Sequence, residues 1–306
     1  EWAPEGEREE YVSTTVVVAP VGDGPGEVGY WEMPEAGRLW ADRFTVDGHG
    51  NIYILDKVNH RVAIFDPGGR FLENVPYDHI PGWRDVIDLA ADGEGNLYLL
   101  YRDDGVKFLD QAGQVFQEYS RPSWLLSIQG IRVDEQGMLW IVGEGSHPEA
   151  PMIEGEPYPW VAVPLGNRVE ILTEDQQEKA AVSGVMLFSG AVIIDYDPTG
   201  NGPAFLYDPQ GRRIYEHTLV QSVMGVDTWG HLYLLEHKLM AGGQEATFIR
   251  KCDPKGRMVS TFGPLEAEAS VDTVGYILID GKGIVHIFIW NWATEGAYRV
   301  IRWVQK

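Results

Sequence analysis

An Asp-x-x-Gly motif followed by an apolar and aromatic run recurs along this chain of 306 residues. Its copies begin at Asp47, Asp92, Asp134, Asp227 and Asp280. The steps between them are 45, 42, 93 and 53 residues, and 93 is close to twice the others, so we expect a degenerate copy within the long gap, at Phe188–Gly190. Six repeats of this size, none able to bury both its faces alone, predict one repeat array rather than six separate domains.

Each repeat carries two turn signals with short apolar or alternating runs between them, which is typical of antiparallel strands. The first repeat predicts strands over Asn51–Leu55, Arg61–Phe65 and Phe71–Val75, with a Pro- and Gly-containing turn at Asp66–Gly69. The same turn signal returns at Asp110, Asp208 and Asp253. With the strand that precedes each Asp-x-x-Gly turn, the count is four strands per repeat. The predicted fold is an all-β, six-bladed β-propeller with four-stranded antiparallel blades.

The last repeat is one strand short, and the N-terminus offers a strand without a repeat. Tyr11–Ala19 is rich in β-branched residues, so we expect it to complete the last blade and close the ring. The same strand could instead add to a neighbouring molecule, because backbone hydrogen bonds do not distinguish a chain from its copy. The predicted organisation is an N-terminal extension over residues 1–40, with the closing strand at about 11–19, and a propeller over 41–306 with a loop insertion at 143–166.

The first repeat also carries the residues of a family resemblance. Its segment Asp56–Asp66, with the tract Asn59-His60, resembles an NHL repeat, a family of six-bladed propellers. Streptogramin lyases and peptidyl-hydroxyglycine lyases are propeller enzymes of similar type, and they tend to place histidines where the innermost strand of a blade begins. The corresponding places here hold Asp42, Asp85, Gln129 and Met224, so the resemblance does not carry the metal ligands of those lyases over to this chain.

Composition limits the partners. The chain has 46 acidic and 24 basic residues, a net charge of −22 and a pI near 4.6, which would repel phosphate backbones and anionic lipid. No apolar run approaches the roughly 20 residues that span a bilayer. We therefore expect no nucleic-acid partner and no membrane insertion. The chain begins without Met, which fits a secreted or periplasmic protein after signal removal as well as it fits a cloning choice. The lone Cys252 is expected to be a thiol buried in a strand.

Loops joining the second and third strands of each blade form the face where propellers usually place their sites. On this chain those loops hold Lys57, Arg102 and many carboxylates. Carboxylate oxygens from several blades could hold Ca²⁺ or Mg²⁺. The candidate ligands are Asp195, Asp197, Glu236 and His237. Asp, Asn, Gly and Pro are also ordinary turn residues, so turns alone explain the same pattern.

The insertion at 143–166 contains five prolines among acidic and aromatic residues, which predicts a semi-rigid loop beside the third blade. Tyr158 and Trp160 within it, and Tyr30 and Trp31 in the leader, are residue types favoured where proteins contact partners. A tolerated surface insertion is the alternative.

The motifs Gly-x-Ser-x-Gly, Gly-Lys-Ser/Thr and His-Glu-x-x-His are absent, and no catalytic residue can be assigned from the sequence. The sequence thus predicts a non-catalytic, extracytoplasmic binding or assembly scaffold that uses its loop faces, and exchange of the N-terminal strand, for protein binding or self-association. The alternative is a metal-dependent lyase or hydrolase with its site on the carboxylate-rich loop face over the central channel.

Overall fold

The computed structural model shows a chain built almost entirely of strands and turns, divided into two compact units. Unit 1 comprises residues 1–16, 187–295 and 299–306, and unit 2 comprises residues 17–186 and 296–298. The structure describes residues 10–33, 37–102, 105–110, 112–134, 137–145, 152–153, 156–157, 160–167, 169–183, 185–186, 192–195, 204–207, 213–217, 223–227, 229–240, 243, 245–253, 257–265, 274–280, 282–291 and 296–306. Within these residues, no helix is long and apolar enough to cross a membrane.

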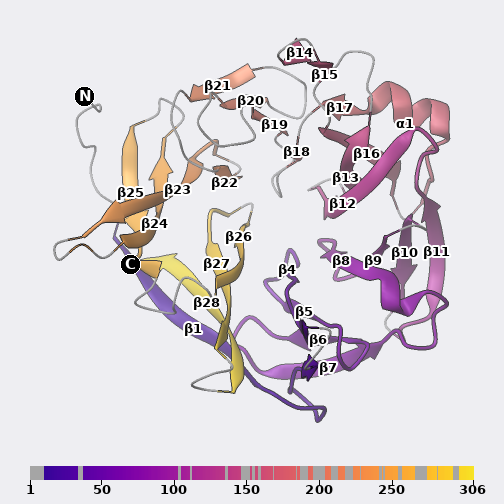
Figure 1. The fold of residues 1–306 in the computed structure, drawn as a ribbon, viewed down its shortest axis with the longest axis horizontal. Helices are drawn as coiled ribbons and strands as arrows, with labels where there is room; N and C mark the ends of the chain where they lie inside the picture. Colours follow the sequence, from indigo (N-terminus) through magenta and orange to yellow (C-terminus); the bar gives the residue numbers. More distant parts are fainter. Residues whose placement is uncertain are drawn as a thin grey trace. The chain divides into compact units, whose positions relative to one another are not determined.

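The fold is an all-β propeller with four-stranded antiparallel blades (Figure 1). Unit 2 holds three of these blades, each formed in chain order. They are β4 (Phe44–Val46), β5 (Ile52–Asp56), β6 (Arg61–Phe65) and β7 (Phe71–Pro76); β8 (Val86–Ala91), β9 (Leu97–Tyr101), β10 (Gly105–Leu109) and β11 (Val115–Ser120); and β12 (Leu125–Val133), β13 (Leu139–Gly145), β16 (Trp160–Gly166) and β17 (Val182–Ser183). The innermost strand β8 packs against the innermost strands β4 and β12 of the two neighbouring blades.

Two further blades follow. One has the order β18 (Val185–Met186), β19 (Val192–Asp195), β20 (Ala204–Tyr207) and β21 (Arg213–His217), and the next has the order β22 (Val223–Val226), β23 (Leu232–Leu239), β24 (Glu245–Cys252) and β25 (Met258–Phe262). Smaller elements complete the described chain: hairpins β2 (Tyr30–Met33) with β3 (Gly37–Trp40) and β14 (Met152–Ile153) with β15 (Glu156–Pro157), a 3-10 turn η1 (Trp83–Asp85), and the helix α1 (Glu174–Ala180).

The described residues thus form five blades from strands in chain order, one fewer than the six that the sequence predicts. The last repeat supplies three strands in chain order, as the sequence predicts, β26 (Val274–Ile279), β27 (Val285–Asn291) and β28 (Ala297–Gln305). Their sheet has the order β1-β28-β27-β26, in which β1 (Tyr11–Pro20) comes from the other end of the chain. The closure of a ring by β1 stays a prediction.

The Asp-x-x-Gly motif folds into a turn whose aspartate organises the strand that follows. The Asp47 carboxylate accepts backbone hydrogen bonds from His49 and Asn51 through Oδ1, at 2.8 and 2.9 Å, and the Tyr53 hydroxyl donates to Oδ2 at 2.9 Å. The donor six residues after the aspartate recurs at the other four turns. These pairs are Tyr98 with Asp92 at 3.3 Å, Trp140 with Asp134 at 2.9 Å, Tyr233 with Asp227 at 3.1 Å and His286 with Asp280 at 3.1 Å. The aromatic residue of the repeat is therefore a hydrogen-bond donor as well as a core side chain.

Cys252 lies in β24 and is fully buried, as the sequence predicts. Burial raises the pKa of its thiol to about 11. A thiol with so high a pKa holds little thiolate near neutral pH, so Cys252 has the properties of a core residue and not of a nucleophile.

The predicted insertion at 143–166 is shorter than expected. Its two ends extend the β13 and β16 ladder, in which Gly143 pairs with Val161 and Glu144 pairs with Trp160. Val161–Val163 are completely buried and belong to the core of the third blade. The prolines of this segment favoured the prediction of a loop. Pro164, however, lies within the buried run Val161–Leu165, one residue before its end.

Candidate functional site: a cationic pocket in unit 2

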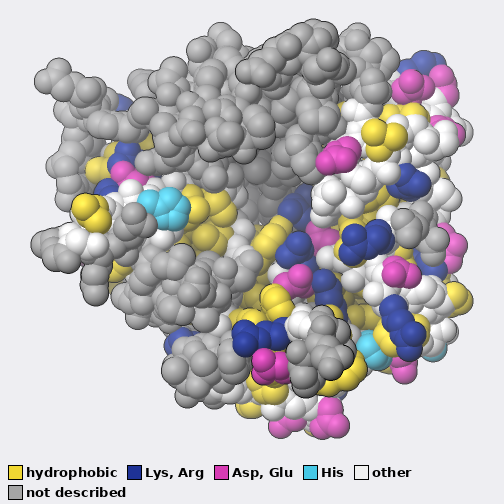
Figure 2. Space-filling view, in the orientation of Figure 1, with side chains coloured by type: hydrophobic (Ala, Val, Ile, Leu, Met, Phe, Trp, Pro, Cys, Tyr) yellow, Lys and Arg dark blue, Asp and Glu magenta, His cyan; other side chains and the backbone are white. Residues whose placement is uncertain are grey.

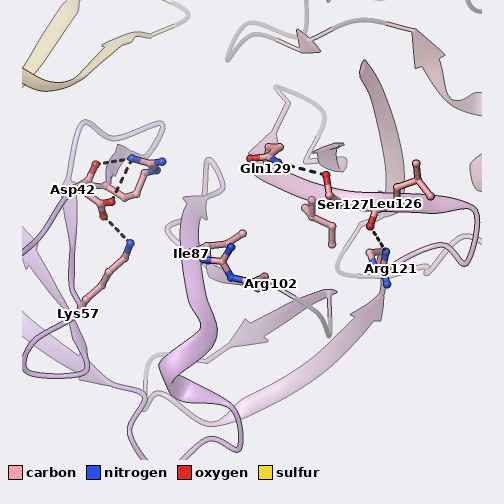
Figure 3. A pocket seen from close by; sticks show the side chains of 10 residues that line it. Asp42, Lys57, Ile87, Arg102, Arg121, Leu126, Ser127 and Gln129 are labelled. Carbon is pink, nitrogen blue, oxygen red and sulfur yellow. Dashed lines mark hydrogen bonds and ion pairs between the residues drawn. The ribbon is translucent and has the colours of Figure 1, made fainter. Parts of the chain in front are cut away.

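A pocket with a volume of about 390 Å³ opens among the turns of unit 2 that lead into or follow the inner strands. Its size is within the range of sites for small molecules. We call it the cationic pocket. Its lining consists of Asp42, Arg43, Lys57, Ile87, Arg102, Arg121, Leu126, Ser127, Ile128 and Gln129. Figure 3 shows Asp42 and Lys57 on one side, Leu126 and Arg121 on the other, and Arg102 between them.

Three blades contribute residues to this pocket. Asp42 and Arg43 directly precede β4, while Gln129 lies in β12. Lys57 and Arg102 directly follow β5 and β9, the second strands of their blades. The sequence had indicated these turns as the place for a site, because loops at one end of a propeller converge. It had not indicated that their cations would meet.

Asp42 is the one carboxylate of the lining, and it is shared by two cations. Its Oδ1 lies 2.7 Å from Lys57 Nζ, and its Oδ2 lies 3.7 Å from Arg43 Nη1. The Arg43 guanidinium also approaches a second carboxylate, with Nε 3.8 Å from Asp88 Oδ1. Asp42 and Arg43 are about one-third exposed, so solvent and a bound molecule can reach them.

Asp88 is a buried carboxylate behind the pocket and joins the inner strands of three blades. It lies in β8 and is 3% exposed. Its Oδ2 accepts hydrogen bonds from the Ile131 backbone N–H at 3.2 Å and from Arg132 Nη1 at 3.3 Å. Since its Oδ1 faces Arg43, this one side chain positions cations from the blades on both sides of its own.

Arg102 and Arg121 complete the cationic character. Arg102 is exposed and has no ion-pair partner among the described residues. The Arg121 guanidinium donates to the backbone carbonyls of Leu125 and Leu126, the latter at 3.0 Å, and it too has no carboxylate partner in the described part of the chain.

The lining therefore carries four cations and one carboxylate in a chain whose net charge is −22. Figure 2 shows Lys and Arg side chains gathered on the face formed by unit 2, over the region of β4, β8 and β12. Such a concentration of unneutralised guanidinium groups attracts an anion, and planar guanidinium groups match carboxylate geometry.

A second pocket, of about 400 Å³, lies in the same unit and differs in chemistry. We call it the aromatic pocket. Its lining consists of Trp31, Leu39, Lys57, Val58, His60, Tyr77, Trp83, Arg84 and Val86. The His60 and Trp83 ring centroids are 3.8 Å apart, and the Arg84 guanidinium lies 4.7 Å from the Trp83 ring centroid. Lys57 lines both pockets.

The predicted metal ligands are not brought together in the part of the chain that the structure describes. Asp195 ends β19, its side chain lies outside the described residues, and so does Asp197. Glu236 is ion-paired with Arg250 and with Lys238, at 3.0 Å from the latter, whereas His237 Nδ1 lies 3.2 Å from Thr247 Oγ1. Glu236 and His237 are neighbours in β23, so their side chains leave opposite faces of the sheet. Within the described ranges, no three His, Cys, Asp or Glu side chains form a metal-binding group. The Ca²⁺ or Mg²⁺ site stays a prediction.

The predicted partner-binding residues have different settings. Tyr158 and the Trp160 side chain lie outside the described residues. The Tyr30 hydroxyl donates to Glu32 Oε2 at 3.2 Å in hairpin β2 and β3. Trp31, 55% exposed, lines the aromatic pocket. Whether these residues contact a protein partner stays a prediction.

No protein-family model and no curated protein matches the sequence. The resemblance to NHL repeats is therefore confirmed for the propeller fold but not for the family.

Solved structures match the fold along nearly the whole chain. A member of the DUF4221 family from Bacteroides vulgatus is 8% identical, covers 98% of this chain and 100% of its own, and has a TM-score of 0.54. A gluconolactonase from Xanthomonas campestris is 12% identical, covers 99% of both chains and has a TM-score of 0.50. A virginiamycin B lyase from Staphylococcus aureus is 9% identical, covers 97% of this chain and 100% of its own, and has a TM-score of 0.47.

These likenesses correct the prediction of a non-catalytic scaffold. One solved propeller of similar fold is an enzyme by its description, a gluconolactonase, so the likeness of fold gives a non-catalytic role no support. For this chain itself, identities of 8–12% establish the propeller fold.

Proposed function

We propose that this protein is an enzyme, a hydrolase or lyase that acts on a small carboxylate-bearing substrate held in the cationic pocket. The observation that carries the proposal is the excess of cations in the lining, where Arg102 and Arg121 have no carboxylate partner among the described residues. The solved gluconolactonase of similar fold adds support, because its name indicates a reaction whose product is a sugar acid.

The lining supplies groups for two steps of such a reaction. Arg102 and Arg121 would bind the substrate carboxylate and hold its reacting carbon in place. A guanidinium facing a lactone or ester carbonyl would stabilise the oxyanion that develops as water adds. Asp42, the one carboxylate of the lining, is the candidate base for that water or for an acidic C–H. The Lys57 ammonium at 2.7 Å keeps the Asp42 carboxylate oriented toward the pocket.

The test is hydrolysis of a panel of lactones and esters in pairs, one member with a free carboxylate and one with a neutral amide in its place. We expect turnover of the carboxylate members, with kcat/KM lowered by about 10- to 100-fold in the Arg102→Ala variant, which corresponds to the loss of a charge-assisted hydrogen bond of about 1.5–3 kcal/mol. The matched control is Arg70→Ala, because Arg70 is 79% exposed and, among the described residues, forms an ion pair only with Asp66 on an outer turn of the same unit.

Equal turnover of the carboxylate and amide members, or equal effects of the two arginine substitutions, would reject the cationic pocket as the site. A chelator added to the same assay tests the predicted divalent metal, since activity that depends on bound Ca²⁺ or Mg²⁺ falls when the ion is removed.

We also propose that β1 closes the propeller within its own chain, as the final strand of an otherwise incomplete blade. The Glu10 carbonyl accepts a hydrogen bond from the Lys306 backbone N–H at 2.9 Å, and the Val21 N–H donates to the Gly296 carbonyl at 2.8 Å, an antiparallel alignment with β28. The Tyr11 ring centroid lies 4.5 Å from that of Phe262 in unit 1.

Removal of residues 1–20 is therefore expected to lower the midpoint of thermal unfolding and to make the protein associate, because β28 becomes an unpaired edge. Thermal unfolding and light scattering over a range of concentrations measure the two effects. A truncated chain that stays monomeric with an unchanged midpoint would refute this role of β1. Secretion and binding of a protein partner stay predictions.

A further inference from the structure

We infer that the aromatic pocket is a second subsite, which binds a planar apolar group of the same substrate whose carboxylate occupies the cationic pocket. The inference rests on the proposed function and narrows its substrate class to aryl carboxylates and their lactones or esters. Its basis is the lining of the aromatic pocket and the position of that pocket beside the cationic one.

The inner wall of the aromatic pocket is a set of fixed rings. Tyr77 is 1% exposed, and the His60 ring lies 6.5 Å from it and 3.8 Å from Trp83, measured between centroids. His60 has a φ of 54°, a left-handed conformation that is unusual for a residue with a side chain. The turn after β5 therefore holds the His60 ring against Trp83 at a backbone cost.

Trp31 supplies an exposed indole to the same pocket. It pairs across hairpin β2 and β3 with Leu39, which also lines the pocket, and 55% of its surface is exposed. An indole with that much free apolar surface, in the lining of the same pocket as Trp83, offers a face on which a flat ring can stack.

The two pockets adjoin each other. Val86 and Ile87 are consecutive residues of β8, at an irregularity in its pairing with β9, and Val86 lines the aromatic pocket while Ile87 lines the cationic pocket. Lys57 lines both, with its Nζ at the Asp42 carboxylate. A molecule with a ring at one end and a carboxylate at the other would occupy both pockets.

The polar groups of the aromatic pocket favour an aryl ligand over a sugar. A sugar ring needs donors and acceptors around its edge, whereas the described lining has no carboxylate or amide side chain, and beside the cations Lys57 and Arg84 its side-chain acceptors are the His60 ring and the Tyr77 hydroxyl. Arg84 is itself stacked on Trp83 at 4.7 Å. Cations at the rim of an apolar slot are attracted to the electron-rich face of an aromatic ring.

Calorimetric binding of three probes tests the inference. The probes are 2-naphthoate, decalin-2-carboxylate, which has the same carbon skeleton without planarity, and 2-naphthalenemethanol, which has the ring without the charge. We expect 2-naphthoate to bind at least tenfold more tightly than either of the others. Trp31→Ala should remove its advantage over the saturated acid, and Trp31→Phe should restore most of it. Trp229→Ala is the matched control, since Trp229 is 63% exposed and lies outside both pockets.

The Arg102→Ala variant separates the inference from the proposed function. It should weaken both acids by the same factor and leave the alcohol unchanged. Equal affinities of 2-naphthoate and the saturated acid, or an advantage that survives Trp31→Ala, would overturn the aromatic subsite even if carboxylate-bearing lactones are turned over. Conversely, a Trp31-dependent preference for 2-naphthoate without any turnover would support the subsite while the proposed enzyme activity fails.

Discussion

Replacement of Asp47 by alanine is expected to lower the free energy of unfolding by about 3 kcal/mol, the largest loss for any single turn residue of the first blade. The Asp47 side chain satisfies four donors at once. These are the backbone N–H groups of His49 and Asn51, the Asn51 side-chain amide and the Tyr53 hydroxyl. Alanine leaves the Tyr53 hydroxyl without its strongest acceptor inside the core, where Tyr53 is 4% exposed.

Through Tyr53, the loss of the Asp47 carboxylate also affects the contact between the first blade and the next. Burial, with the Asp47 carboxylate beside it, raises the pKa of the Tyr53 hydroxyl above its usual range, so the group remains a donor at all ordinary pH values. The same hydroxyl lies 3.5 Å from the Gly95 carbonyl in the turn of the next blade. The aspartate therefore aligns the contact between two blades as well as one turn.

Asp66 provides the matched control for Asp47. It forms the same kind of turn on the outer side of the same blade, where it accepts hydrogen bonds from the backbone N–H groups of Gly68 and Arg70. It has no buried aromatic donor, and Arg70 beside it is largely exposed. Chemical denaturation of Asp47→Ala and Asp66→Ala should give a clearly smaller loss for Asp66→Ala. Equal losses would show that the turns, and not the aromatic donors, carry the stability.

The strands and turns were predictable because their signals are local. The turns at Asp47 and Asp66 can each be identified from a few consecutive residues. The strand predicted at Arg61–Phe65 is found with the same bounds. The Tyr11–Ala19 run was recognised as a strand from its β-branched residues and is found as Tyr11–Pro20. At the end of the repeat series the fourth strand of the sheet comes from some 280 residues away, and it was expected from the strand missing in the last repeat and not from a local turn signal.

The candidate site was predictable in position but not in character. The sequence indicated that Lys57 and Arg102 follow second strands and that Asp42 and Gln129 stand at innermost strands, which is where the cationic pocket lies. Their convergence depends on how far each turn reaches and on which way each side chain points. The abundance of carboxylates in the loops and the net charge of −22 suggested a site for a cation. The charge of the pocket itself is set by a few arginines, and the overall composition does not show where these lie.

Replacement of the buried Asp88 by asparagine is expected to destabilise the protein by about 2 kcal/mol and to make it unusually responsive to anions. Asparagine keeps an acceptor for the Ile131 N–H but removes the charge that faces Arg43 and Arg132. The cost is moderate because the two arginine side chains are 33% and 24% exposed and can reach water. With its internal counter-charge gone, Arg43, which lines the cationic pocket, should bind an external anion more tightly.

Thermal unfolding in sodium sulfate and in sodium chloride of equal ionic strength measures this response. Sulfate should raise the unfolding midpoint of Asp88→Asn by more than it raises that of the unaltered protein, because an anion bound only by the folded chain stabilises it by mass action. Asp47→Asn serves as the control, since Asp47 is also a buried carboxylate but has no ion-pair partner among the described residues. An equal response of Asp88→Asn and Asp47→Asn would mean that Asp88 does not counterbalance the pocket. A larger response confined to Asp88→Asn would show that one buried carboxylate limits how strongly the cationic pocket attracts its ligand.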